Sequence, residues 1–246
     1  MNYSVEVIDN AIPKDMMNDV WTYIQNQKYH ATRKNLGYPH VGKVVYYIPA
    51  ENKKEYLTEE FPCVNNQYMH RTVFGNNEND LNDHPIILNL WNKINETFGN
   101  QFVIDGDLEG IADNGNGKPV LSRVYVNAQP EETIKRSHGV HRDTIDLNEV
   151  NNFTLLYIAN LEWYPTWMAE NIFYSDGETG DTQKWQKGYG QCRGFNVGWP
   201  YKTVSPVPGR IILYDGRALH TTKPASAWAE HHRYAVVFRI RKSNAK

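Results

Sequence analysis

Two amphipathic segments in the first hundred residues have the spacing of helices. Residues 3–9 (YSVEVID) alternate polar and apolar positions, as a half-buried strand does, and residues 10–27 then repeat apolar residues with helical spacing. The apolar stripe of this first helix consists of Met17, Val20, Trp21 and Ile24. Asn10 or Asp9 can cap its start, with Pro13 near the first turn.

A second helix is predicted between two less regular stretches. Residues 43–50 (KVVYYIPA) indicate a short strand, and residues 85–99 place apolar residues on one helical stripe that ends at Gly99. The stripe consists of Ile87, Leu90, Trp91 and Ile94. Residues 111–119 are rich in Asn and Gly, so we expect a loop that separates an N-terminal layer from the rest of the chain.

The pattern changes after residue 118, where short aromatic and β-branched runs are separated by Gly and Pro. The runs are VLSRVYVNA, NFTLLYIANLEW, NIFYSD, YKTVSPV, GRIILYDG and RYAVVFRIR. They contain no useful helical period, which favours an antiparallel barrel or a two-sheet jelly roll. The predicted fold class is therefore α+β. It is one domain, residues 1–246, with a strand and helix layer (1–117) packed on one sheet of a jelly-roll core (118–243).

Composition limits which binding partners and which cellular compartment we expect for this protein. The formal net charge of -2 gives no overall attraction to nucleic acid or to an anionic membrane, and we expect neither as a partner. The two cysteines are in no metal-binding spacing, and the chain begins without a signal-peptide pattern. We therefore expect a cytoplasmic protein; the oligomeric state is left open.

The stretch SHGVHRDTID (137–146) holds the strongest chemical signal. His141 and Asp143 are two positions apart, so an extended backbone points both toward the same side. A metal needs a third ligand, and His220 is the best candidate because it follows a strong strand and a turn. Two histidines and one carboxylate form the facial triad of non-haem Fe(II) oxygenases, which leaves open positions on the metal. His138 is an alternative ligand, although its spacing from His141 suits a helix better than an extended run.

Several motifs around this pair resemble those of the Fe(II)/2-oxoglutarate-dependent dioxygenase superfamily, in its prolyl 4-hydroxylase-like branch. HRD is similar to the family's H-x-D, and NFTLLYIANLEW to its next strand, which ends in Asn160 and Trp163 here. SPVPGRIILYDGRALHTTKP is similar to the segment that carries the distal histidine, and RYAVVFRIR to the last strand. The opening strand and helix also agree loosely, whereas residues 28–117 match nothing in the family.

The resemblance implies a double-stranded β-helix (cupin-like) core and a set of cofactors. These are Fe(II), 2-oxoglutarate as co-substrate and O₂, with ascorbate as an optional reductant. Arg233 would bind the distal carboxylate of 2-oxoglutarate, for which the planar guanidinium suits a bidentate pair. Tyr125 and Asn127 share a strand face near its chelating end. Thr154 or Tyr157 would be a second partner of the distal carboxylate, and strand parity alone leaves the choice open.

The sequence also departs from the family pattern. Arg233 follows His220 by thirteen positions, a longer interval than usual, so Lys223 is an alternative anchor. The family often has Gly-Gly-Glu-Leu after its tryptophan, but this chain has Met168 and Ala169 before Glu170. Residues 175–200 are a Gly-rich and Trp-containing insertion, which is either a lid over the substrate or a surface excursion.

These features favour an oxygenase that hydroxylates an unactivated C–H bond of a peptidyl proline or a small molecule, with release of succinate and CO₂. Asp143 argues against a halogenase of this superfamily, in which that position is small. A non-catalytic β-sandwich binding module, with or without a structural metal, is the alternative of another class. A zinc hydrolase is a third reading, but it has no use for a buried arginine behind the metal.

Overall fold

The computed structural model of the chain describes residues 2–27, 29–31, 45–48, 53–56, 69–74, 81–104, 119–129, 140–144, 152–177 and 197–242. The helices are α1 (Lys14–Gln25), α2 (Pro85–Thr97) and the short 3-10 turns η2 (Leu81–Asp83) and η3 (Pro165–Trp167). The N-terminal strands are β1 (Val5–Ile8), β2 (Tyr29–Ala31), β3 (Val45–Ile48), β4 (Lys53–Tyr56), β5 (Met69–Phe74) and β6 (Val103–Ile104). The remaining strands are β7 (Pro119–Gln129), β8 (Asn152–Ile158), β9 (Asn171–Asp176), β10 (Val197–Val204), β11 (Ile211–Asp215), β12 (Leu219–Thr222) and β13 (Arg233–Lys242).

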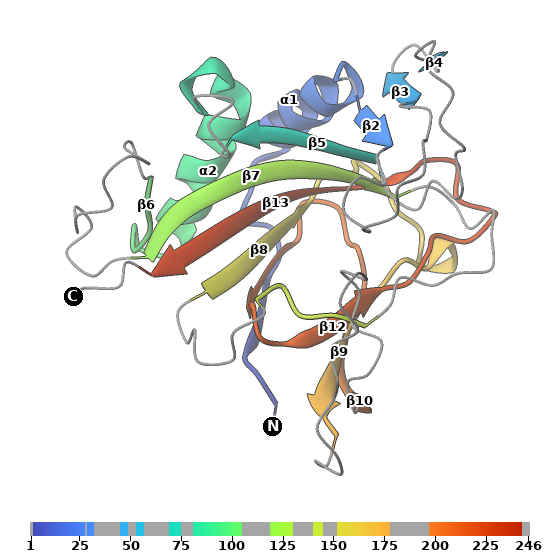
Figure 1. Ribbon diagram of the computed structural model, residues 1–246. Helices are drawn as coiled ribbons and strands as arrows, with labels where there is room; N and C mark the ends of the chain where they lie inside the picture. Colours follow the sequence, from blue (N-terminus) through green and yellow to red (C-terminus); the bar gives the residue numbers. More distant parts are fainter. Residues whose placement is uncertain are drawn as a thin grey trace.

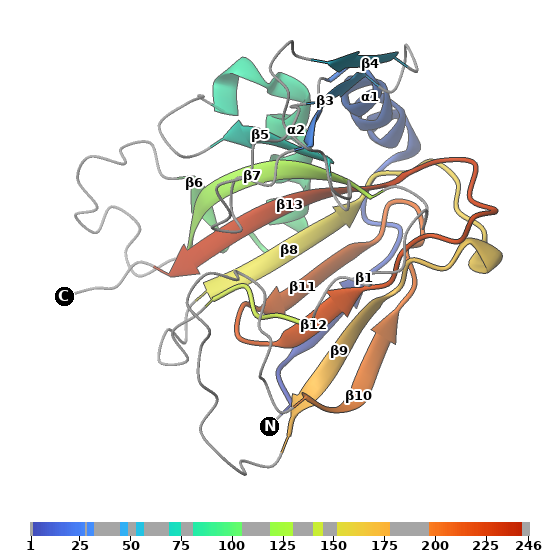
Figure 2. The ribbon, with the colours of Figure 1, turned by 45° about the vertical axis from the view of Figure 1, so that its right-hand side comes forward.

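Two sheets face each other, and helices cover the outer side of the larger one (Figures 1 and 2). The large sheet has the strand order β1-β11-β8-β13-β7-β5-β2-β3-β4, with β6 beside β7, and the small sheet has the order β10-β9-β12. Apart from the β6–β7 pair, the pairs are antiparallel. The predicted α+β fold with helices on one sheet is therefore confirmed.

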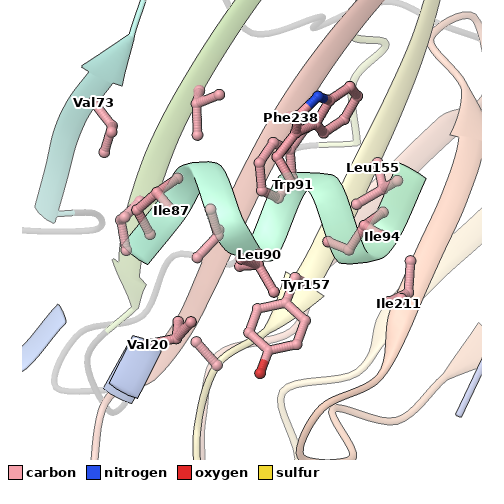
Figure 3. Close-up of a cluster of buried hydrophobic side chains, with 14 of the residues drawn as sticks. Val20, Val73, Ile87, Leu90, Trp91, Ile94, Leu155, Tyr157, Ile211 and Phe238 are labelled. Carbon is pink, nitrogen blue, oxygen red and sulfur yellow. The ribbon is translucent and has the colours of Figure 1, made fainter. Parts of the chain in front are cut away.

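Helix α2 packs across the large sheet with the stripe that the sequence predicted. Its buried residues are Ile87, Leu90, Trp91 and Ile94. Figure 3 shows them against Leu155, Tyr157 and Phe238 of the sheet, and the rings of Trp91 and Phe238 lie 5.3 Å apart. Gly99 has a φ of +70°, which suits glycine just after a helix end. Burial of each such side chain contributes about 1.5–3 kcal/mol.

The N-cap of helix α1 lies three residues after Asn10 and four after Asp9, the two residues predicted to cap it. Its N-cap is Pro13, with no side-chain cap, and neither Asn10 nor Asp9 has that role. Asp9 instead accepts two hydrogen bonds of 2.7 Å from Arg210, and Asn10 adopts a φ of 59°. The cap assignment was therefore wrong, because a tertiary ion pair takes the Asp9 carboxylate. Among the described helices, none has the length and apolar character needed to cross a membrane.

The face of the large sheet that looks toward the small sheet has its own core. Leu156 of β8, Ile212 of β11 and Val237 of β13 pack there against Phe173 and Val204 of the small sheet. Alternate residues of the same strands, such as Leu155 and Val236, belong to the core under the helices. Because side chains alternate along a strand, this division tells which residues of β7, β8, β11 and β13 point to the inner face.

Candidate metal centre

Backbone pairing brings the H-x-D segment beside the distal histidine. His141 and His220 form an antiparallel bridge in which each N–H donates to the other's carbonyl oxygen at 2.9 Å. The N–H of Asp143 donates at 2.8 Å to the carbonyl oxygen of Gly216, in the turn between β11 and β12. The segment therefore runs alongside β12, which places His141 and His220, 79 positions apart in the chain, next to each other.

Three potential ligands converge at this bridge. One ligand atom each from His141, Asp143 and His220 lies within 4.8 Å of the others. Nε2 of His141 is 3.9 Å from Oδ1 of Asp143, and Nε2 of His220 is 3.8 Å from Oδ2. Two imidazoles and a carboxylate are a donor set that suits a divalent transition metal. The alternative ligand His138 lies outside the described residues.

The protonation of His220 is suited to a metal ligand. Its Nδ1 lies 3.0 Å from the carbonyl oxygen of Ala218, an acceptor that requires the proton on Nδ1. The Nε2 lone pair then faces Asp143 and His141. Burial, together with the neighbouring His141, lowers the pKa of His220 to about 4, so its imidazole is neutral at neutral pH.

The Asp143 carboxylate is held by hydrogen bonds from one side. Its Oδ2 accepts from Thr154 Oγ1 at 2.7 Å and from the Tyr214 hydroxyl at 2.9 Å, and it forms an ion pair with Arg239 Nη1 at 2.8 Å. Burial on its own would raise the pKa of Asp143, but the charge of Arg239 and the hydrogen bond from Thr154 outweigh it and hold that pKa well below its usual range. The carboxylate is therefore ionised, as a ligand must be.

Sequence reasoning missed Arg239 and Tyr214. Both lie on the inner face. Arg239 is two positions from Val237 on β13, Tyr214 is two positions from Ile212 on β11, and residues two apart on a strand share a face. A signal was available: Arg239 and Arg233 are six positions apart, so both point to the same face of one strand. The sequence alone does not show that Thr154 of β8 pairs with both β11 and β13.

A second polar cluster lies in the interior around Arg233. Arg233 is 3% exposed at the start of β13, and its Nη2 donates to Asn171 Oδ1 at 3.2 Å. The same oxygen accepts from Thr222 Oγ1 at 2.9 Å, and Thr222 is two positions beyond His220 on β12. Nδ2 of Asn171 is buried without an acceptor among the described residues. A guanidinium and an amide N–H that needs an acceptor suit a carboxylate.

The alternative anchor and the four neighbouring candidates are placed differently. Lys223 is half exposed, and its Nζ lies 3.7 Å from Glu170. Tyr125 and Asn127 are half-buried on the inner face of β7, and burial together with the Asp143 charge raises the pKa of Tyr125 to about 12. Thr154 is bonded to Asp143, as described above. Tyr157 points the other way, into the core under the helices (Figure 3).

The turn at the family's glycine positions keeps a backbone that glycine prefers. Met168 has φ 57° and ψ -134°, and Ala169 has a φ of 68°. The surrounding structure holds the turn, because Met168 pairs with Ala225 and its carbonyl oxygen accepts from Trp163 Nε1 at 3.0 Å. Most of the insertion at 175–200 lies outside the described residues, and its prediction as a lid or a surface excursion remains open.

Several solved structures share this fold. A prolyl hydroxylase from Trichoplax adhaerens, in complex with a hypoxia inducible factor oxygen degradation domain peptide fragment, aligns at a TM-score of 0.53 and 15% identity over 97% of this chain and 83% of its own. HygX from Streptomyces hygroscopicus, with nickel, 2-oxoglutarate and hygromycin B bound, aligns at 0.52 and 10% identity over 99% and 84%. AviO1 from Streptomyces viridochromogenes Tue57 aligns at 0.51 and 13% over 100% and 92%. No protein-family model and no curated protein sequence matches the chain.

The chain thus has the double-stranded β-helix fold of the 2-oxoglutarate- and Fe(II)-dependent oxygenases. At identities of 10–15%, this likeness is one of fold. The residues present also fit the cofactors that the fold implies. The neutral His220 and the ionised Asp143 fit a divalent metal, and the buried cluster at Arg233 fits a carboxylate.

Proposed function

We propose that the protein is an Fe(II)- and 2-oxoglutarate-dependent oxygenase that hydroxylates an unactivated C–H bond. The observation that carries the proposal is the convergence of His141, Asp143 and His220 on one point, together with the buried Arg233 on the inner face of the large sheet. A binding module without turnover has no need for both features. When bound, iron and 2-oxoglutarate would supply the oxidising chemistry with O₂, releasing succinate and CO₂.

Each residue of the site has a distinct part in this proposal. His141, Asp143 and His220 would hold the iron on one face, which leaves the opposite positions for the co-substrate and O₂. Arg233 would pair with the distal carboxylate, assisted by Asn171 and Thr222 from the facing small sheet. Because Arg233 is almost fully buried, that ion pair would be shielded from water.

The neighbouring candidates have smaller parts. Tyr125 and Asn127 lie on the inner face of β7 and could contact the chelating end of the co-substrate or the substrate. Thr154 would hold the carboxylate of Asp143 in place and would not bind the distal carboxylate of 2-oxoglutarate, because its hydroxyl donates to Oδ2 of Asp143. Tyr157 and Lys223 have no part in the proposed site, since Tyr157 faces the helix core and Lys223 pairs with Glu170 near the surface.

The substrate class we propose is a peptidyl proline or a small molecule. Two neighbours of the same fold support it, because their structures contain a hypoxia inducible factor peptide and hygromycin B respectively. His141 supports substrate access, since its side chain is 35% exposed while that of His220 is 7% exposed. The exposed side of the metal centre is therefore the side at which a substrate would approach.

The test is an anaerobic titration of the protein with Fe(II) and 2-oxoglutarate. Chelation of iron by 2-oxoglutarate produces a weak visible charge-transfer band, and we expect this band in the native protein. It should vanish in His141→Ala, which removes a ligand. In Arg233→Gln, a shorter neutral amide replaces the guanidinium, and 2-oxoglutarate affinity should fall by at least about 10-fold, the typical effect of losing a charge-assisted hydrogen bond.

Matched controls separate these effects from general damage. His231→Ala removes a half-exposed histidine that lies 3.3 Å from Glu162, and Arg241→Gln removes an exposed arginine of β13. Both variants should keep the band and the affinity. A native protein that binds no Fe(II), or whose bound Fe(II) gives no band with 2-oxoglutarate, would overturn the oxygenase proposal and favour the binding-module alternative.

A further inference from the structure

Arg239 makes more contacts with the candidate metal ligand Asp143 than the other residues around it. Its Nη1 is 2.8 Å from Oδ2 of Asp143 and also donates to Thr154 Oγ1 at 2.8 Å, while its Nη2 donates to the backbone carbonyl of Asp143 at 2.6 Å. One guanidinium therefore holds both the side chain and the main chain of Asp143. It also fixes the direction in which Thr154 donates, because the threonine oxygen is occupied as an acceptor.

The two oxygens of the Asp143 carboxylate are consequently unequal. Oδ2 accepts hydrogen bonds from Thr154 and Tyr214, which match its two lone pairs, and Arg239 Nη1 adds an ion pair at 2.8 Å. Oδ1 lies on the side of His141, at 3.9 Å from Nε2. A metal between the histidines can therefore take Oδ1 without disturbing these contacts, whereas Oδ2, which lies 3.8 Å from Nε2 of His220, is already enclosed by Arg239, Thr154 and Tyr214.

We propose that Arg239 is a positioning residue that restricts Asp143 to binding the metal through Oδ1 alone. The inference rests on the proposed metal site and adds a role for a residue on a different strand from the ligands. A carboxylate that binds through one oxygen leaves three positions of an octahedral metal open, whereas one that chelates leaves two. Three open positions are what a chelating co-substrate and O₂ together require.

Charge makes Arg239 the decisive donor among the three. The ion pair at 2.8 Å adds an attraction between full charges that the two neutral hydroxyl groups lack, and Arg239 is only 20% exposed, so solvent screens the pair weakly. Tyr214 and Thr154 are neutral donors, and the Tyr214 hydroxyl is also 3.3 Å from His220 Nε2, which divides its interaction. Loss of the guanidinium should therefore free Oδ2, whereas loss of the hydroxyls should not.

The test counts water molecules on Mn(II) bound to the protein without co-substrate, from the broadening of the Mn(II) EPR lines in ¹⁷O-enriched water. We expect three waters in the native protein and two in Arg239→Met, which has a similar length but no donors. Arg239→Lys keeps a point charge at Oδ2 and should restore three waters. Arg241→Met, on the same strand but exposed, should also give three.

A double variant keeps the proposal falsifiable if Arg239→Met does not fold. Thr154→Val with Tyr214→Phe removes both neutral donors and retains Arg239, so three waters are expected; two waters would show that Arg239 does not restrict the carboxylate. Three waters in Arg239→Met, or two in the native protein, would likewise overturn the proposal. A native protein that does not bind Mn(II) at all would instead overturn the metal site itself, so the two failures are distinguishable.

Discussion

The backbone conformation of Met168 predicts that glycine at this position gives a more stable protein than alanine, although glycine usually destabilises relative to alanine. Met168 has φ 57° and ψ -134°, a region that residues with a Cβ avoid and glycine tolerates. Such a conformation costs of order 1–3 kcal/mol, and glycine removes that cost while losing about 0.4–1 kcal/mol through the greater freedom of the unfolded chain. The balance favours glycine over alanine at this position by about 1 kcal/mol.

The comparison must be Met168→Gly against Met168→Ala, because both variants lose the half-exposed methionine side chain and only one relieves the backbone. For a chain of this size, about 1 kcal/mol raises the melting temperature by roughly 2–4 °C, which calorimetry or circular dichroism resolves. The control is Asn18, an exposed position inside α1, at which glycine should be less stable than alanine by about 1 kcal/mol. If glycine were the less stable variant at both positions, the strain argument would be refuted.

Three further predictions concern the site and the core. Burial lowers the pKa of His220 to about 4, so between pH 7 and pH 5 the unfolded chain binds a proton that the folded chain does not bind. Without metal, the free energy of unfolding measured in urea titrations should therefore fall by about 2 kcal/mol from pH 7 to pH 5. His220→Asn should lose most of this pH dependence. Tyr157→Phe removes a buried hydroxyl that has no partner among the described residues, so we expect unchanged 2-oxoglutarate affinity and stability equal or higher by about 1 kcal/mol; a 10-fold loss of that affinity would return Tyr157 to the co-substrate site. Leu90→Ala opens a cavity under α2 and should cost about 2–5 kcal/mol in chemical denaturation, and a loss below about 1 kcal/mol would contradict the packing in Figure 3.

Local periodicity explains what the sequence could predict. The stripe of α2 is buried as a unit because helical spacing depends only on neighbouring residues, and the short strands after residue 118 follow from the same kind of local signal. The cap of α1 failed for the opposite reason. Asp9 has the right residue type for a cap, but Arg210, about 200 positions away, binds its carboxylate, and the helix begins only after Pro13. No local pattern contains that information.

The choice between Thr154 and Tyr157 shows a second limit of local patterns. Strand β8 is covered by helices on one face and by the small sheet on the other, so its residues from Thr154 to Ile158 are buried whichever face they point to. A strand of this kind has lost the alternation that would tell its faces apart. Only the tertiary structure assigns Thr154 to the inner face and Tyr157 to the helix core.

The surroundings of Asp143 depend on sheet register, which a single sequence does not encode locally. Thr154 of β8 pairs directly with Tyr214 of β11 and with Arg239 of β13, so the three donors stand in one row across three strands. A slip of β13 by one residue would turn Arg239 to the helix core and bring Phe238 or Ile240 to the inner face. Such a slip would also bury a guanidinium among apolar side chains at a cost of several kcal/mol. Arg239, which we propose to position Asp143, therefore also favours the strand register that brings it to the inner face.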